Sequence, residues 1–132
     1  MRRRCLPSVE ECYRGRSVRV FRLDREGVLS RLRERAQDVV RSDPRVREVR
    51  LFGSLARGDA KPGSDADLFI VVRDGAPPFL ERIANLAKRF TGVGIGCDVI
   101  AYTESERAAL AERHDRFARV VLEEGVVLAV AP

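Results

Sequence analysis

The sequence predicts an α+β fold, in which a mixed sheet of about four to five strands is covered by helices mainly on one face. Two observations support this prediction. Short apolar runs typical of strands alternate with longer segments in which apolar residues recur at helical spacing. Turn-forming residues separate these segments, and the resulting order is β-α-β-β-α-β-α-β. We expect one domain over residues 17–132, preceded by a loosely ordered tail over residues 1–16.

The first predicted elements are a short edge strand over residues 18–23 and an amphipathic helix. Asp24 is placed to cap this helix, and Asp43-Pro44 ends it. Apolar residues recur on one helix face, with arginine and glutamate on the other. The apolar positions are Val28, Leu29, Leu32, Ala36, Val39 and Val40. We therefore expect the helix to pack its apolar face on the sheet.

Two core strands are predicted in the middle of the chain. Residues 46–52 have a strand pattern that runs directly into Gly53-Ser54. Residues 65–72 form a second, largely buried strand after the Pro62-Gly63 turn. Residues 53–64 therefore connect the end of one core strand to the start of the next.

The residue pattern in the second half of the chain predicts two further helices and two further strands. Pro77-Pro78 opens a helix, and a strand follows over residues 95–102. Thr103-Glu104-Ser105-Glu106 has the pattern of a capping box, so we expect one helix from Thr103 to about Glu124, with His114 on its surface. Gly125 ends this helix, and residues 126–130 form a final short strand.

Composition limits the class of protein. The hydrophobic content of 45% and the charged content of 34% suit a soluble globular protein, and no apolar run approaches the roughly 20 residues of a membrane helix. No apolar stretch follows the basic start, which argues against a secretory signal, so we expect a cytoplasmic protein. The 3 cysteines lack the spacing of a zinc site, and their odd number argues against a disulfide framework. We expect free thiols, with Cys97 a small buried hydrophobe.

The net charge of +5 raises the question of a nucleic-acid partner. The arginines, however, are interspersed with acids, and no aromatic stacking platform accompanies them. This pattern is typical of a solvated surface and argues against nucleic acid as the partner.

The acids carry the strongest chemical signal. On a strand, residues two apart point to the same face, so Asp65 and Asp67 should project together. Their mutual repulsion would be relieved by a divalent cation such as Mg²⁺, which binds one or two carboxylates plus water and phosphate oxygens. Asp98 lies in an otherwise apolar strand and either faces a metal, a base or the solvent rim, or lies on an exposed face. If its strand neighbours residues 65–68, the acids converge.

A turn suited to phosphate precedes these acids. A strand that turns into a short helix at Gly53-Ser54 exposes backbone N–H groups, and glycine allows a phosphate to approach the backbone closely. The glycine-rich residues 91–96 precede a strand rather than follow one, so they do not fit a dinucleotide-binding motif. We interpret them as a flexible connection.

Together, residues 51–58 (LFGSLARG), residues 64–68 (SDADL) and Asp98 on a later strand resemble the minimal nucleotidyltransferases of the polymerase-β-type nucleotidyltransferase superfamily. These are small prokaryotic proteins that are often encoded beside a helical partner of the HEPN type. The resemblance spans roughly residues 18–130. It implies a polymerase-β-like nucleotidyltransferase core and an antitoxin-like role beside a HEPN protein.

The resemblance also implies a role for each motif residue. Gly53 and Ser54 would hold the phosphates of a nucleoside triphosphate, and Asp65 and Asp67 would bind the Mg²⁺ ions of a two-ion site. Asp98 would complete the site, as a ligand of the second ion and as a base toward the acceptor hydroxyl.

Arg57 and Ser64 also match the motif and are expected to support nucleotide binding. For Arg57, the alternative is a salt bridge within its own loop. The residues alone do not decide between these two interpretations.

The resemblance implies Mg²⁺-dependent transfer of a nucleoside monophosphate, AMP from ATP, to an acceptor such as a hydroxyl of a HEPN-type toxin, with release of pyrophosphate. The alternative is a non-catalytic, antitoxin-like module that inhibits a HEPN partner by occlusion, since no acceptor-binding domain is visible in this short chain. A nucleic-acid polymerase, a transfer RNA transferase or an aminoglycoside-modifying enzyme would need more chain. The acceptor, the base preference and the oligomeric state, homomeric or heteromeric, stay open.

Overall fold

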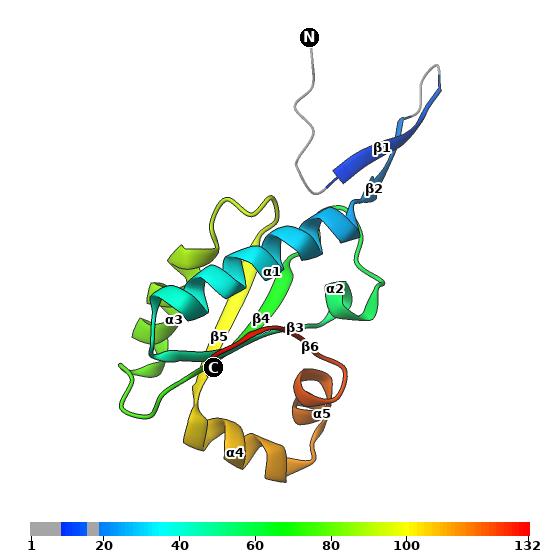
Figure 1. Ribbon diagram of the computed structural model, residues 1–132. Helices are drawn as coiled ribbons and strands as arrows, with labels where there is room; N and C mark the ends of the chain where they lie inside the picture. Colours follow the sequence, from blue (N-terminus) through cyan, green and yellow to red (C-terminus); the bar gives the residue numbers. More distant parts are fainter. Residues whose placement is uncertain (1–8, 16–18) are drawn as a thin grey trace.

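The computed structural model describes residues 9–15 and 19–132, and its centre is a four-stranded sheet with the strand order β5-β4-β3-β6 (Figure 1). The strands are β3 (Val46–Phe52), β4 (Ala66–Val72), β5 (Cys97–Thr103) and β6 (Val126–Val130). β3 is antiparallel to both β4 and β6, whereas β4 and β5 are parallel. The predicted mixed sheet is thereby confirmed.

The larger core lies on the face covered by helices α1 (Arg25–Ser42) and α3 (Phe79–Ala87), together with the short 3₁₀ helix η1 (Lys88–Phe90). The carboxylate of Asp24 accepts a hydrogen bond from the N–H of Gly27 at 3.1 Å and caps α1, as its position predicts. Fully buried apolar side chains from α1 and from two central strands fill this core. They include Val28, Leu32, Ala36, Val39, Val49, Leu51, Leu68 and Ile70.

A smaller helical layer covers the other face of the sheet. Helices α4 (Glu104–Arg113) and α5 (Arg116–Leu122) pack there, and Figure 1 shows them on the side of β3 and β6 opposite to α1. Their buried cluster contains Phe69, Val71, Leu110, Ala118 and Val121. The prediction places the helices mainly on one face, which holds for the larger core, but it did not include this second layer.

The predicted single helix from Thr103 to about Glu124 is wrong, because the chain breaks it at His114. This residue has a left-handed backbone (φ 53°) and ends α4, so it does not lie on a continuous helix surface. The Asp115 carboxylate then accepts a hydrogen bond from the N–H of Ala118 at 2.9 Å and starts α5. The break gives α5 a direction of its own, and α5 packs against β3.

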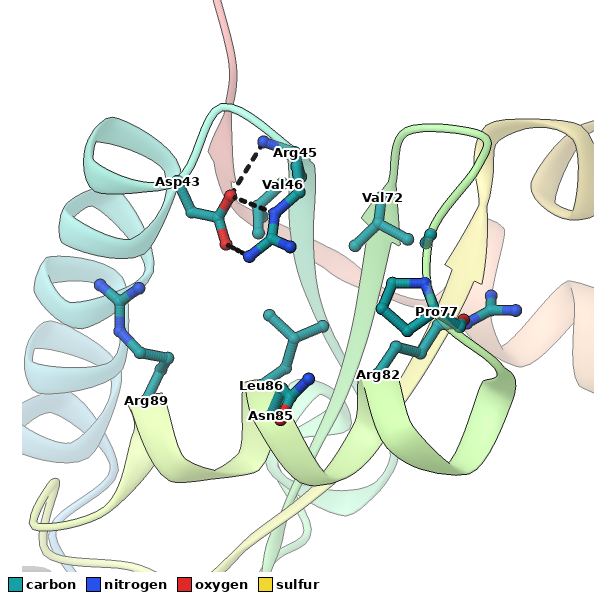
Figure 2. Close-up of a pocket in the computed structure, with 10 residues that line it drawn as sticks. Asp43, Arg45, Val46, Val72, Pro77, Arg82, Asn85, Leu86 and Arg89 are labelled. Atoms are coloured by element: carbon teal, nitrogen blue, oxygen red, sulfur yellow. Dashed lines mark hydrogen bonds and ion pairs between the residues drawn. The ribbon is translucent and has the colours of Figure 1, made fainter.

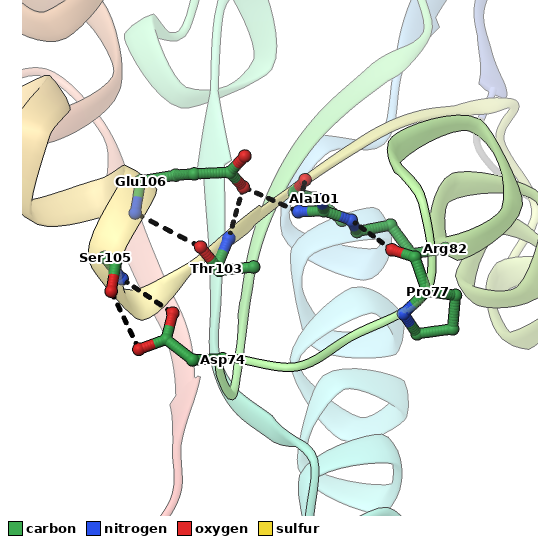
Figure 3. A network of polar contacts seen from close by, with 7 residues as sticks. All are labelled: Asp74, Pro77, Arg82, Ala101, Thr103, Ser105 and Glu106. Atoms are coloured by element: carbon green, nitrogen blue, oxygen red, sulfur yellow. Dashed lines mark hydrogen bonds and ion pairs between the residues drawn. The ribbon is translucent and has the colours of Figure 1, made fainter.

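The capping box predicted at residues 103–106 is confirmed and belongs to a polar network at the end of β5 (Figure 3). The Thr103 N–H donates to the Glu106 carboxylate at 2.8 Å, and this carboxylate also pairs with Arg82 at 2.6 Å. The buried Arg82 guanidinium donates to the carbonyls of Pro77 (3.1 Å) and Ala101 (3.2 Å) as well. The network therefore joins α3, β5 and the start of α4.

The N-terminal strands form a separate hairpin. β1 (Val9–Arg14) pairs antiparallel with β2 (Arg19–Leu23), and these two strands make their own sheet. A strand is thus present where the edge strand was predicted, but it pairs with β1 and does not join the central sheet. β1 itself lies within the predicted tail and was not anticipated. The rest of that tail, residues 1–8 and 16, lies outside the described residues, as do residues 17 and 18. The domain boundary at residue 17 stays a prediction.

Helix α2 and a loop connect β3 to β4. Helix α2 (Ser54–Arg57) is a single turn directly after β3, and the loop then leads to β4.

Within the described ranges, none of the helices combines the length and the apolar character that crossing a membrane requires.

Candidate active site

The acids of the motif lie at one end of the sheet, where β3 ends and β4 and β5 begin. In the register of the sheet, Asp67 on β4 lies opposite Asp98 on β5. Residues in register on neighbouring strands have their side chains on the same face, so these two carboxylates are neighbours. Asp65 lies just before β4, which begins at Ala66 rather than at residue 65. The two strands are neighbours, which the sequence had left open, and their pairing brings the three acids to one end of the sheet.

Electrostatics reflect this arrangement. The pKa of Asp67 is raised, first by burial of its carboxyl group and then by the negative charges of Asp98 and Asp65, while the positive charge of Arg57 lowers it. Burial and the same two acids raise the pKa of the Cys97 thiol to about 11. The Cys97 thiol is therefore protonated near neutral pH, although its side chain is half-buried rather than buried as expected. A cation placed among the acids would relieve their repulsion.

The glycine of the predicted phosphate turn is in contact with the acids. Gly53 has φ 78° and ψ −155°, a backbone conformation that residues other than glycine rarely adopt. A β-carbon at this position would also collide with the Asp67 carboxylate. Ser54 starts α2, whose first N–H groups have no acceptor within the helix. The turn and the acids therefore form one continuous surface.

A second glycine lies against Asp65. A β-carbon on Gly96 would collide with the Asp65 carboxylate, and the Gly96 carbonyl accepts a hydrogen bond from the N–H of Ala66 at 2.8 Å. Residues 91–96, interpreted from the sequence as a flexible connection, thus end in a residue that packs on Asp65. We call the end of the sheet that carries Asp65, Asp67 and Asp98 the acidic edge. Without a structure, the pattern gives no reason to connect Gly96 with Asp65.

Helix α2 is held in place by Arg25, a residue that the sequence did not single out. The guanidinium of Arg25, at the start of α1, donates from Nε to the carbonyl of Leu55 at 3.1 Å and from Nη2 to the carbonyl of Ala56 at 3.3 Å. Gly58 ends α2 in a left-handed conformation (φ 89°). Because 30 residues separate Arg25 from Leu55, no local pattern could reveal this contact.

Arg57 and Ser64 have structural contacts of their own. Arg57 pairs with Asp59 at 3.2 Å, and both side chains are exposed, so this loop salt bridge contributes little stability. The charge of Arg57 also acts on Asp67, as described above. The Ser64 hydroxyl accepts a hydrogen bond from the N–H of Lys61 at 3.0 Å and closes the turn before Asp65. Roles for either residue in nucleotide binding stay predictions.

The carboxylates fit a hard divalent cation. Among the residues that the structure describes, no three side chains of His, Cys, Asp or Glu are already gathered around one point. Mg²⁺ does not need such a cage, since it is held through one or two carboxylates together with waters and substrate phosphates. Asp65 and Asp67, with Asp98 beside them, supply this kind of donor set.

A pocket of about 150 Å³ lies at the opposite end of the sheet (Figure 2). It is lined by the start of β3, the end of β4 and α3, and its floor is apolar, with Val46, Val72 and Leu86. Its single acid, Asp43, binds Arg45 through two hydrogen bonds to the guanidinium, and Arg45 lowers the pKa of this carboxyl. The pocket therefore has no free acidic pair and is distinct from the acidic edge.

Residues 29–128 match the family model of the nucleotidyltransferase domain. The chain belongs to this family. The matched region contains every predicted site residue, from Gly53 to Asp98, so the predicted resemblance to nucleotidyltransferases is confirmed, and with it the enzyme class.

Two solved structures are similar to this nucleotidyltransferase. A protein from Sulfolobus solfataricus, assigned as a nucleotidyltransferase, is 25% identical, with a TM-score of 0.57 and coverage of 78% of this chain and 80% of that chain. A toxin-antitoxin structure with AMP-PNP is 19% identical, with a TM-score of 0.45 and coverage of 83% and 75%. No curated protein sequence matches the chain significantly.

The contact between Arg25 and α2 yields a prediction for nucleotide binding. We expect Arg25→Met to weaken binding of the nucleoside triphosphate about tenfold, since hydrogen bonds from a charged donor contribute about 1.5–3 kcal/mol each and their loss frees α2. Arg25→Lys keeps the charge and should restore part of the affinity. Calorimetric titration with ATP measures both effects, and unchanged affinity in Arg25→Met would show that α2 holds its position without this contact.

Proposed function

We propose that this nucleotidyltransferase transfers a nucleoside monophosphate, AMP from ATP, to an acceptor hydroxyl and releases pyrophosphate. One observation carries the proposal: Asp67 lies in register with Asp98 and in contact with Gly53, so one carboxylate borders both another acid and the phosphate turn. Acids alone would suit many metal sites. Their contact with an N–H-bearing glycine turn specifically favours a triphosphate bound through both metal and backbone.

Asp65 and Asp67 would hold Mg²⁺ in a two-ion site that Asp98 completes. When bound, Mg²⁺ supplies neutralisation of the charge on the triphosphate and on the departing pyrophosphate. Gly53 and Ser54 donate backbone N–H groups to phosphate oxygens, and the missing side chain of Gly53 leaves room for them. Arg57, exposed beside α2, exchanges its salt bridge with Asp59 for a phosphate oxygen.

The reaction is a displacement at the α-phosphorus. The acceptor oxygen forms a bond to this phosphorus while the bond between the phosphorus and the α,β-bridging oxygen of the triphosphate breaks, so that pyrophosphate leaves with that oxygen. Asp98 accepts the proton of the acceptor hydroxyl and later returns it to solvent. Ser64 keeps the turn before Asp65 closed, so that this carboxylate stays beside Asp67.

The proposed acceptor is a hydroxyl of a helical HEPN-type partner protein in the cytoplasm. Support for this partner comes from the resemblance of residues 51–58 and 64–68 to the minimal nucleotidyltransferases. A catalytic antitoxin of this kind modifies its partner, whereas a purely binding antitoxin covers the partner's active surface.

Neutralisation of the partner distinguishes these two mechanisms. The test is to co-express the native partner with the wild-type chain or with the Asp65→Asn, Asp67→Asn double variant, and to measure growth and complex formation. We expect the double variant to bind the partner but to lose neutralisation, because binding does not require the acids. Full neutralisation by the double variant would instead favour occlusion.

A further inference from the structure

The acidic edge also has an aromatic side. In the register of the sheet, Phe52 on β3 lies opposite Asp67, and Asp98 lies opposite Asp67 on the other side. The three side chains therefore form one row across β3, β4 and β5, with Asp67 in the middle. Phe52 packs against the cluster beneath α4 and α5, which places the row on that face of the sheet.

Helix α5 adds a second ring beside this row. Phe117, in the first turn of α5, meets Phe52 with ring centroids 6.1 Å apart and ring planes at 85°. Phe117 also contacts Tyr102, with ring centroids 6.3 Å apart and ring planes at 38°. The side chains of Phe52 and Phe117 are half-buried rather than enclosed. Phe52 and Phe117 thus form an aromatic wall next to Asp67, and part of this wall remains accessible.

Side-chain amides, which read base edges by paired hydrogen bonds, lie far from this wall. The chain has only two of them, Asn85 and Gln37. Asn85 lines the pocket at the opposite end of the sheet (Figure 2), and Gln37 lines a groove between α1 and β6. Neither amide therefore lies where it could contact a base beside Asp67, whereas Phe52 and Phe117 do.

We propose that the nucleobase of the bound nucleoside triphosphate stacks on the aromatic wall of Phe52 and Phe117. The inference rests on the proposed function, because Asp67, which would hold the triphosphate, lies on the same face of the sheet as Phe52. Stacking accepts any base, since every base has a π-face. The binding step should therefore not discriminate between ATP and GTP, so that ATP in the proposed reaction is one of the triphosphates that this site accepts.

The test compares a triphosphate with and without a base. Wild-type protein and the variants Phe117→Leu and Phe52→Leu are titrated with ATP, GTP and inorganic tripolyphosphate in the presence of Mg²⁺. We expect each variant to bind ATP and GTP about 5- to 100-fold more weakly than wild type and tripolyphosphate equally well. Phe79→Leu is the matched control: this ring is 41% exposed and contacts Tyr102, but it lies at the start of α3, and its loss should change none of the affinities.

Each of the other outcomes contradicts the base site, the proposed function or both. If wild-type protein binds ATP and tripolyphosphate equally, or if the leucine variants lose both equally, the base site is wrong and the proposed function stands. If wild-type protein binds neither ATP nor tripolyphosphate, the proposed function fails and the base site with it. A preference for ATP over GTP of more than about tenfold overturns recognition by stacking alone. Thermal denaturation monitors folding, and Phe117→Leu decides the matter if Phe52→Leu does not fold.

Discussion

We expect the Asp65→Asn, Asp67→Asn double variant to lose Mg²⁺-dependent transfer by at least about a thousandfold. Metal-ion catalysis contributes several kcal/mol of charge stabilisation, and each 1.36 kcal/mol corresponds to a factor of about ten in rate. Asparagine keeps the shape of each side chain but removes the charge that holds the cation. The rate of pyrophosphate release from ATP with the acceptor present measures the effect. Asp74→Asn, an exposed acid beyond the other end of β4, is the control and should keep full activity.

The stability of the same variant separates a lost metal site from a damaged fold. Because the folded-state pKa of Asp67 is raised, the folded protein holds this proton more tightly than the unfolded chain does. Stability therefore falls as the pH rises from the ordinary carboxyl pKa through the raised one. In the absence of metal at neutral pH, the double variant should melt no lower than wild type, and Mg²⁺ should raise only the wild-type Tm. If the Tm of the double variant is much lower than that of wild type, misfolding would explain the lost activity.

The second large effect is expected for Gly53→Ala. The alanine is strained at this φ and ψ, which costs about 1–3 kcal/mol, and its β-carbon would displace the Asp67 carboxylate. Displacement of a catalytic group by about 1 Å lowers the rate about a hundredfold. We therefore expect a loss of activity of this order together with reduced stability. Steady-state kinetics and urea denaturation measure the two effects.

Gly63→Ala is the matched control for this variant. Gly63 also has a positive φ, 91°, but a β-carbon there meets no atom within 4 Å. Gly63→Ala should lose about 1–2 kcal/mol of stability for the left-handed backbone and keep its catalytic rate. Equal losses of activity in the two variants would show that backbone strain, and not the contact with Asp67, explains the effect.

The features of the site that the sequence predicted depend on local spacing. Asp67 lies at the start of a strand and Gly53 directly follows one, so the strand pattern predicted the places of both. Asp65 lies just before β4 and not on it. The place of Asp98 beside Asp67 depends on the pairing of β4 with β5, which the sequence left open and the structure shows.

The features that were missed depend on contacts between distant residues or on unusual local conformations. Residues 112–116 (ERHDR) are an uninterrupted polar run between the apolar residues of α4 and those of α5. The prediction assigned this run to the surface of one helix and so missed the left-handed break at His114. The strand β1 begins with Val9 followed by two glutamates and lacks the apolar alternation of a core strand. The anchor from Arg25 to α2 and the contact of Phe117 with Phe52 join segments that only the tertiary structure brings together.

The most direct test of the proposed chemistry follows the phosphates of ATP separately. The chain, co-purified with its native partner, is incubated with Mg²⁺ and ATP that carries a radiolabel in either the α- or the γ-phosphate. Transfer of a nucleoside monophosphate at the acidic edge predicts that only the α-label enters the partner, that the γ-label leaves as pyrophosphate, and that the Asp65→Asn, Asp67→Asn variant transfers neither. Transfer of the γ-label, or equal α-labelling by the double variant, would contradict the account.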